Sequence, residues 1–179
     1  MMKKKVILGI SSSISAYKAC DLIRLFVKAD YSLYAVLTER ATNLITPLTL
    51  ENLSGNPVYT DSFAVVRRDM AHIELKENAS LMLVAPATAN IIGKFANGIA
   101  DDLLSTTFLS VTCPVVIAPA MNPNMWNHPA TQRNIQRLKS WDIVFVEPEI
   151  GEALCGDEGR GKLADIQKIF EVSVGAIKG

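Results

Sequence analysis

Two side chains of the sequence are suited to moving protons near neutral pH, and they lie far apart along the chain. His72 lies in the segment Met-Ala-His-Ile-Glu-Leu of residues 70–75, and an imidazole has the ordinary pKa that a general base needs. Cys155 lies among the glycines of residues 151–161, where an accessible thiol is able to react. Each also has a structural interpretation, because single histidines commonly cap helices or face solvent and most cysteines are unreactive. The residue types alone leave both roles open.

Small and hydroxyl-bearing residues follow four of the apolar runs in the sequence. These segments are residues 9–14, 37–39, 85–90 and 118–122. Small residues allow a ligand to approach the backbone, and hydroxyl groups and helix N-terminal N–H groups bind phosphate oxygens. The first segment lacks the Gly-x-Gly-x-x-Gly pattern of dinucleotide sites, so it favours a mononucleotide phosphate over NAD. The alternative is that Ser13 or Ser15 only caps a helix, which is the commoner role of such serines.

The remaining titratable candidates favour structural roles. Asp101 and Asp102 are suited to acid–base chemistry or a metal, but a helix N-cap with a favourable first-turn charge is the better interpretation for at least one of them. His128 precedes a proline and a helical pattern, which also fits a cap. Cys20 and Cys113 lie in apolar contexts and look structural. The three cysteines show no close pair and no zinc spacing, so we expect a reducing compartment and no metal site.

Short apolar runs that alternate with helical patterns must position these groups. Strands are predicted at residues 4–9, 32–37, 81–85, 115–118 and 143–146, and helices at 15–29, 88–96, 103–110, 131–139 and 165–177, with two short helices within 38–53. This alternation is typical of a three-layer, doubly wound α/β fold with a parallel sheet, of the Rossmann/flavodoxin-like class. Ligands bind such sheets beyond the carboxyl ends of the strands, where the hydroxyl-bearing segments lie. The glycine-rich residues 148–162 are either a lid or a plain connection.

Length and charge exclude several classes of protein. The chain has 179 residues, 18 basic and 18 acidic side chains, and a hydrophobic fraction of 49%. This length fits one domain covering residues 1–179. Zero net charge disfavours a nucleic acid partner. No apolar run reaches the roughly 18 residues of a membrane helix, and the apolar stretch after the first lysines is too short for a secretory signal. We therefore expect a cytoplasmic protein with neither a membrane nor a nucleic acid partner.

Two motifs stand out in the sequence: Pro-Ala-Met-Asn-Pro-Asn-Met-Trp at residues 119–126 and Pro-Ala-Thr-Ala-Asn at residues 86–90. They resemble the Pro-x-Met-Asn-x-x-Met-Trp and Pro-Ala-Ser-Ala-Asn motifs of the homo-oligomeric flavin-containing cysteine decarboxylase family. Residues 153–161 resemble the cysteine-bearing flap of the branch that acts in coenzyme A synthesis, and residues 45–48 and 70–75 match the family too. The resemblance extends from about Lys4 to Lys162. Members of this branch are often fused to a ligase, and the chain resembles the stand-alone form.

The resemblance implies FMN as the cofactor. The residues it places around FMN, from the phosphate to the isoalloxazine, are Ser12, Ser13, Ile14, Thr38, Ala87, Thr88, Ala89, Asn90, Ala120 and Met121. Of these, the first three would lie at the phosphate and the last two beside the isoalloxazine. Many relatives have glycine where this chain has Ser12, whose Cβ narrows the backbone conformations there.

The resemblance also implies a reaction, the decarboxylation of 4′-phosphopantothenoylcysteine to 4′-phosphopantetheine. Direct loss of CO2 would leave an unstabilised carbanion, whereas oxidation to a thioaldehyde creates an electron sink beta to the carboxylate, and flavin accepts the hydride. By the resemblance, His72 is the base in the oxidation, and Asn122 and Met125 bind the substrate. Cys155 then protonates the enethiolate so that the hydride returns. The overall reaction is redox-neutral and needs no NAD.

Three other functions are alternatives to this interpretation. A peptidyl-cysteine oxidative decarboxylase of the lantibiotic type stops after oxidation, and Cys155 argues against it. A flavin-binding regulatory subunit has no need of His72, Asn122 and Cys155 together. A flavin prenyltransferase does not share the Met-Asn-x-x-Met-Trp stretch. The family forms homo-oligomers, trimers or dodecamers, with FMN near the subunit interface, and the resemblance implies the same here.

Overall fold

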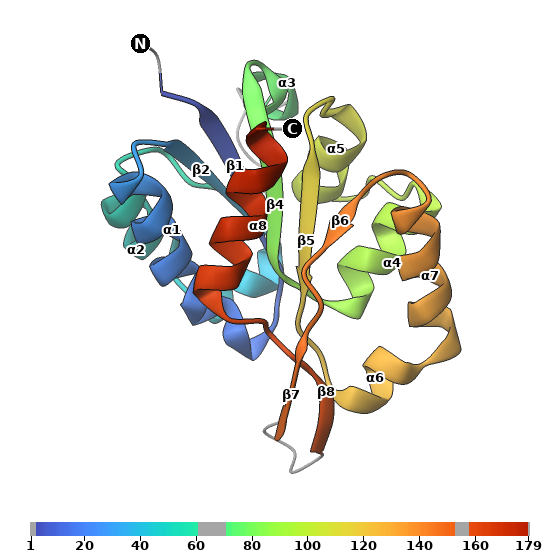
Figure 1. The fold of residues 1–179 in the computed structure, drawn as a ribbon. Helices are drawn as coiled ribbons and strands as arrows, with labels where there is room; N and C mark the ends of the chain where they lie inside the picture. The colour runs from blue at the N-terminus through green and yellow to red at the C-terminus, as the bar shows by residue number, and fades with distance from the viewer. Residues whose placement is uncertain (1–2, 61–70, 153–157, 179) are drawn as a thin grey trace.

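The centre of the structure is a sheet of six parallel strands in the order β3-β2-β1-β4-β5-β6 (Figure 1). This computed structural model describes residues 3–60, 71–152 and 158–178. The strands are β1 (Lys5–Ile10), β2 (Ser32–Leu37), β3 (Tyr59–Thr60), β4 (Ala79–Ala87), β5 (Val115–Pro119) and β6 (Val144–Phe145). The strand order reverses between β1 and β4, which is where doubly wound sheets bind their ligands.

Two layers of helices cover the sheet, one on each face. One layer consists of α1 (Ala19–Lys28), α2 (Pro47–Ser54) and α8 (Ile166–Lys178), and the other of α3 (Ala71–Lys76), α4 (Ala89–Asn97), α5 (Leu103–Ser110) and α7 (Pro129–Lys139). Short helices η1 (Ile14–Lys18), η2 (Glu39–Asn43) and α6 (Pro123–Asn127) follow β1, β2 and β5. The predicted three-layer, doubly wound α/β fold of the Rossmann/flavodoxin-like class is therefore confirmed. None of the helices described here is long and apolar enough to cross a membrane.

Continuous apolar runs form the inner strands because both faces of the sheet are covered. In β1, Val6 and Leu8 pack into the core beneath α1 and α8, while Ile7 packs into the core on the opposite face. All three side chains are fully buried. The predicted break between two short helices within residues 38–53 is confirmed, because Thr46 caps α2 by accepting a hydrogen bond from the backbone N–H of Thr49 at 3.3 Å.

The sequence did not predict three of the strands. β3 has only two residues, too few to produce a hydrophobic pattern. β7 (Glu149–Glu152) and β8 (Glu158–Lys162) form an antiparallel hairpin from residues with weak strand propensity, such as the Glu-Gly-Arg-Gly-Lys of β8. The hairpin extends from the carboxyl end of the sheet beyond α6 (Figure 1). Its strands occupy part of the segment that the sequence left as either a lid or a connection.

Two close contacts hold the hairpin against the loop that follows β5. The backbone N–H of Met121 donates a hydrogen bond to the carbonyl oxygen of Gly161 at 2.9 Å. A Cβ on Gly161 would collide with the carbonyl oxygen of Met121, and one on Gly159 would lie 2.9 Å from the Cβ of Pro123. The two glycines are therefore required by the approach of β8 to this loop.

Candidate functional site

Two adjoining cavities lie at the carboxyl ends of β1, β4 and β5, where the fold predicts a ligand. The first, which we call the hairpin cavity, has a volume of about 450 Å³ and reaches from the β1–η1 loop to the β7–β8 hairpin. The second, the polar cavity, has a volume of about 570 Å³ and reaches from the same loop to η2 and α4. Both are lined by Ser12, Thr88 and Met125, so they form one continuous region.

The cavities bring together most of the site residues predicted from the sequence. The hairpin cavity is lined by Ser12, Ser13, Ile14, Thr88, Ala120, Met121, Asn122 and Met125. The polar cavity adds Thr38 and Asn90. Two of the residues predicted to contact the cofactor line neither cavity: Ala87 is fully buried at the end of β4, and Ala89 is half-buried at the start of α4. Segments that are distant in sequence thus converge because parallel strands end at the same edge of the sheet.

Ser11 holds two of these segments in place, a role that the sequence analysis missed. Its hydroxyl donates a hydrogen bond to the carbonyl oxygen of Pro86 at 2.8 Å and accepts one from the backbone N–H of Thr88 at 2.9 Å. Its own N–H also donates to the Pro86 carbonyl oxygen at 3.2 Å. The buried hydroxyl therefore fixes the loop after β1 relative to the loop after β4. A serine in the first residue after a buried strand was the available signal.

Three of the residues that line the cavities are helix caps. Ser13 caps η1 by accepting a hydrogen bond from the N–H of Ser15, and Thr88 caps α4 in the same way. The expected capping role of Ser13 is thus confirmed. Asn122 caps α6, since its Oδ1 accepts from the N–H of Asn124 at 2.7 Å. This bond sets the orientation of the Asn122 carboxamide, whose other end is an N–H donor group.

Thr38 presents a buried hydroxyl to the polar cavity. Its Oγ1 has no hydrogen-bond partner in the described part of the chain. Leaving a buried hydroxyl unsatisfied costs about 1–3 kcal/mol, so such groups normally have a partner. A phosphate or polyol ligand in this cavity would supply the missing partner. The hydroxyl-rich lining of the cavity therefore fits a phosphorylated ligand.

The paired carboxylates are structural. Asp102 caps α5, accepting hydrogen bonds from the N–H and hydroxyl of Ser105, and it forms an ion pair with Lys94 at 2.5 Å. Burial alone would raise the pKa of Asp102, but hydrogen bonds from Lys94 and Ser105 outweigh it and hold that pKa below its usual value. Asp101 pairs with the same lysine at 2.6 Å. The predicted cap at one of these aspartates is confirmed, and the residues described here contain no cluster suited to a metal ion.

His72 lies away from both cavities within one chain. It is half-buried in the first turn of α3, which packs against α5. Lys5, at the start of β1, donates a hydrogen bond from its Nζ to the Glu74 carbonyl oxygen of the same helix at 2.6 Å. The cavities lie beyond the other end of β1, which spans about 20 Å at roughly 3.3 Å per residue. Figure 1 accordingly shows α3 at the opposite end of the sheet from the hairpin.

The other candidates are placed as follows. His128 caps α7, its Nδ1 accepting from the N–H of Ala130 at 3.2 Å, so its expected capping role is confirmed. Cys20 and Cys113 are half-buried free thiols, and burial raises the pKa of both. A raised pKa keeps these thiols protonated and unreactive, which agrees with a structural role. Cys155 lies outside the described residues.

The sequence matches the family described as Flavoprotein over residues 1–178. It is 44% identical over 171 residues to the coenzyme A biosynthesis bifunctional protein CoaBC of Bacillus subtilis (strain 168), covering 95% of this chain and 42% of that protein. The chain thus spans less than half the length of the bifunctional relatives that it matches.

Two solved structures share the whole fold. A PPC decarboxylase, in a cysteine-to-serine mutant complexed with pantothenoylaminoethenethiol, superposes with a TM-score of 0.86 at 29% identity, covering 99% of this chain and 100% of that one. The FMN-dependent cysteine decarboxylase SpaF superposes with a TM-score of 0.83 at 30% identity, covering 99% of both chains. The similarity therefore includes the β1–η1 loop, the loop after β5 and the hairpin strands.

Proposed function

The chain belongs to the Flavoprotein family, and from this premise we propose that it is an FMN-dependent decarboxylase that converts 4′-phosphopantothenoylcysteine to 4′-phosphopantetheine in coenzyme A biosynthesis. The observation that carries the proposal is the pair of joined cavities, which combine a hydroxyl-rich phosphate site with Asn122 under a glycine-rich hairpin. Sequence similarity to the bifunctional coenzyme A protein and the superposition on a PPC decarboxylase support it.

The residues at the cavities fit FMN. The orphaned hydroxyl of Thr38, the N-terminus of η1 at Ser13 and the hydroxyls of Ser12 and Thr88 together provide donors for a phosphate and for ribityl oxygens. Ile14, Asn90, Ala120 and Met121 complete the set that would hold the cofactor. When bound, FMN supplies two-electron oxidation of the substrate and later returns the electrons. The reaction then needs no external redox partner.

The chain's own residues hold the substrate and move its protons. Asn122 holds the carboxylate by hydrogen bonds from a neutral group, with Met125 packing beside it. His72 removes the proton of the substrate thiol while the substrate is oxidised to the thioaldehyde. The carboxylate electrons then flow toward the C=S group, CO2 leaves and an enethiolate forms. Cys155 protonates that enethiolate, and the proton that His72 took up returns to the product thiolate.

A second copy of the chain supplies His72 to each site. Within one chain His72 lies at the far end of the sheet from Asn122, so a shared site is the simplest way to unite them. Ile14 and Met125, which line the hairpin cavity, are 59% and 48% exposed, as expected of apolar side chains that a neighbouring subunit covers. The assembly is a homotrimer or a dodecamer built from trimers.

The reaction takes place in the cytoplasm, where free thiols such as Cys20 and Cys113 stay reduced. The proposal is tested by incubating purified, FMN-loaded protein with 4′-phosphopantothenoylcysteine and, separately, with a peptide that ends in cysteine. Mass spectrometry should show loss of one CO2 from the first substrate and the saturated thiol as product. Consumption of the peptide alone, with an oxidised enethiol product, would contradict the proposal and favour the peptidyl-cysteine reaction.

A further inference from the structure

Lys162 is the single charged side chain among the described residues that line the hairpin cavity. The other lining groups are serine and threonine hydroxyls, the Asn122 carboxamide, apolar side chains and glycine backbone. The polar cavity differs, because its charged groups include Glu39, Arg40 and the ion-paired Lys94. Lys162 is therefore the one described residue that can bring a charge to this cavity.

The contacts of the hairpin position the backbone of Lys162. Lys162 directly follows Gly161, whose carbonyl oxygen accepts the hydrogen bond from Met121, the neighbour of Asn122. On the opposite strand of the hairpin, a Cβ added to Gly151 would lie 3.0 Å from the Cδ of Lys162 and 4.0 Å from its Nζ. The stem of the lysine thus lies over Gly151, where the missing side chain makes room for it. Both strands of the hairpin contribute to this arrangement.

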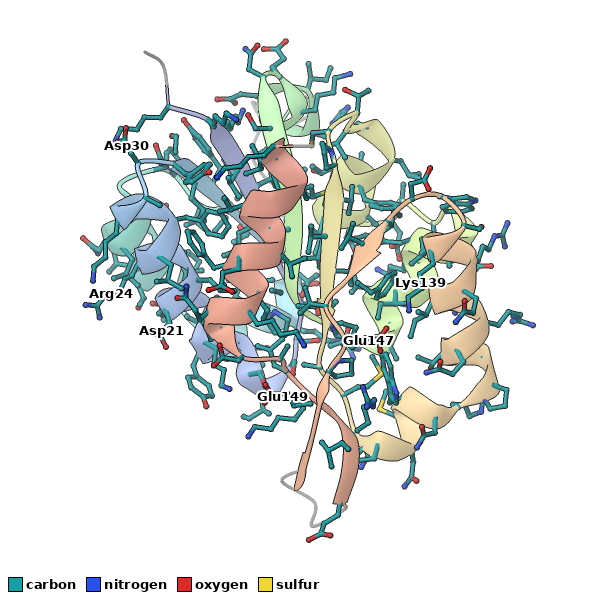
Figure 2. The ribbon with its side chains drawn as sticks, in the orientation of Figure 1. Asp21, Arg24, Asp30, Lys139, Glu147 and Glu149 are labelled. Carbon is teal, nitrogen blue, oxygen red and sulfur yellow. The ribbon has the colours of Figure 1, made fainter. Side chains whose placement is uncertain are left out.

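No carboxylate neutralises this ammonium group within the described part of the chain. Glu149 pairs with Lys162 in the β7–β8 ladder, but its Oε1 instead accepts a hydrogen bond from the backbone N–H of Asp165 at 3.0 Å. Figure 2 shows Glu149 near the first turn of α8. The ion pairs formed by the described residues do not involve Lys162. An exposed ammonium group at the edge of a cavity, with no carboxylate partner among the described residues, is suited to an anionic ligand.

The chemistry of the reaction decides which anion this is. In a decarboxylation the negative charge leaves the carboxylate in the transition state, so an ammonium group on that carboxylate would stabilise the substrate more than the transition state and slow the reaction. The neutral carboxamide of Asn122 avoids this penalty. A phosphate monoester keeps its charge throughout, so an ammonium group can bind it without opposing the chemistry.

We infer that Lys162 binds a phosphate monoester and so selects phosphorylated ligands at this site. The inference rests on the proposed function, which offers two sources of that group, the 4′-phosphate of the substrate and the 5′-phosphate of FMN. Ser12 and Ser13 line the same cavity, so Lys162 and the loop after β1 border one ligand-binding space.

The test compares Lys162→Gln with the wild-type protein in two assays. The first measures kcat/KM for phosphopantothenoylcysteine and for its unphosphorylated counterpart, and the second measures the affinities of the apoprotein for FMN and for riboflavin. Loss of a charge-assisted hydrogen bond should lower the preference for the phosphorylated partner about ten- to hundredfold in one of these assays. A change in the substrate ratio identifies the substrate as the source, and a change in the FMN-to-riboflavin ratio identifies the cofactor.

Two further variants serve as references. Lys162→Arg keeps the charge and should retain most of the preference, and Lys168→Gln removes an exposed lysine from α8 outside both cavities and should leave both ratios unchanged. If both ratios stay at the wild-type value in Lys162→Gln, the inference is wrong. Failure of the proposed function gives a different result, since the wild-type protein would then decarboxylate neither substrate while the flavin-binding assay remained readable.

Discussion

Replacing Gly161 by alanine tests whether the hairpin must approach the loop after β5 for activity. The new Cβ would collide with the Met121 carbonyl oxygen, and Met121 also donates the hydrogen bond that Gly161 accepts. Losing that bond costs about 1 kcal/mol, and relieving the overlap costs about 1–3 kcal/mol more. The backbones must separate by on the order of 1 Å, and displacements of that size near reacting groups lower rates about 100-fold.

The assay is kcat/KM for decarboxylation of phosphopantothenoylcysteine, measured together with the thermal unfolding midpoint. Gly161→Ala should lower kcat/KM about 100-fold while the sheet and its two helical layers stay folded, because the hairpin lies outside both hydrophobic cores. The matched control is Gly175→Ala in α8, where no atom beyond the helix's own backbone and the neighbouring residues lies within 4 Å of the new Cβ. The control should keep full activity and gain about 0.5–1 kcal/mol of stability from its better helix propensity.

The reasoning would be refuted by wild-type activity in Gly161→Ala. That outcome would mean that the contact between β8 and Met121 does not position the substrate-binding loop. Equal losses of activity in Gly161→Ala and in the α8 control would also count against it, because the control changes no contact at the site.

Four further predictions address individual side chains. His72→Asn should keep FMN binding and abolish decarboxylation, and mixing it with an inactive Asn122 variant should restore part of the activity through shared sites; no restoration would contradict the intersubunit site. Cys155→Ser should release CO2 but accumulate an oxidised enethiol, whereas saturated product at the normal rate would leave Cys155 without a catalytic role. Asp102→Asn should lower stability by about 1 kcal/mol at neutral pH. The pKa of Asp102 is lowered in the folded state, so the stability that its carboxylate contributes is complete above the usual aspartate pKa and is lost as the pH falls through the lowered value. The unfolding midpoints of wild type and variant should therefore converge in acid. A difference that stays constant with pH would contradict the ion pair. Thr38→Val should leave the apoprotein as stable as wild type but weaken FMN binding about tenfold, measured by fluorescence titration, while unchanged affinity would remove Thr38 from the cofactor site.

Much of the fold was predictable because its pattern is local. β2 has the predicted bounds, since a strand covered on both faces leaves a continuous apolar run, and α5 also has the predicted bounds. The caps at Asp102 and His128 were predictable for the same reason, because a cap depends on residues two or three positions away.

The remaining features depend on contacts between distant segments. The hairpin is formed from glycines and charged residues, and its β8 strand packs against the loop after β5, which no local pattern encodes. Ser11 bridges two loops that are 75 residues apart in the sequence. The place of His72 follows from the path of the chain around the sheet, so its separation from Asn122 within one chain became visible only in three dimensions.

The most direct test of the account is to identify the product of a reaction carried out without NAD or oxygen. FMN-loaded protein is incubated with 4′-phosphopantothenoylcysteine, and the product is analysed by mass spectrometry while the flavin absorption is recorded. The account predicts 4′-phosphopantetheine over many turnovers with the flavin oxidised at the end. Unchanged substrate, or an oxidised product accompanied by a permanently reduced flavin, would contradict it.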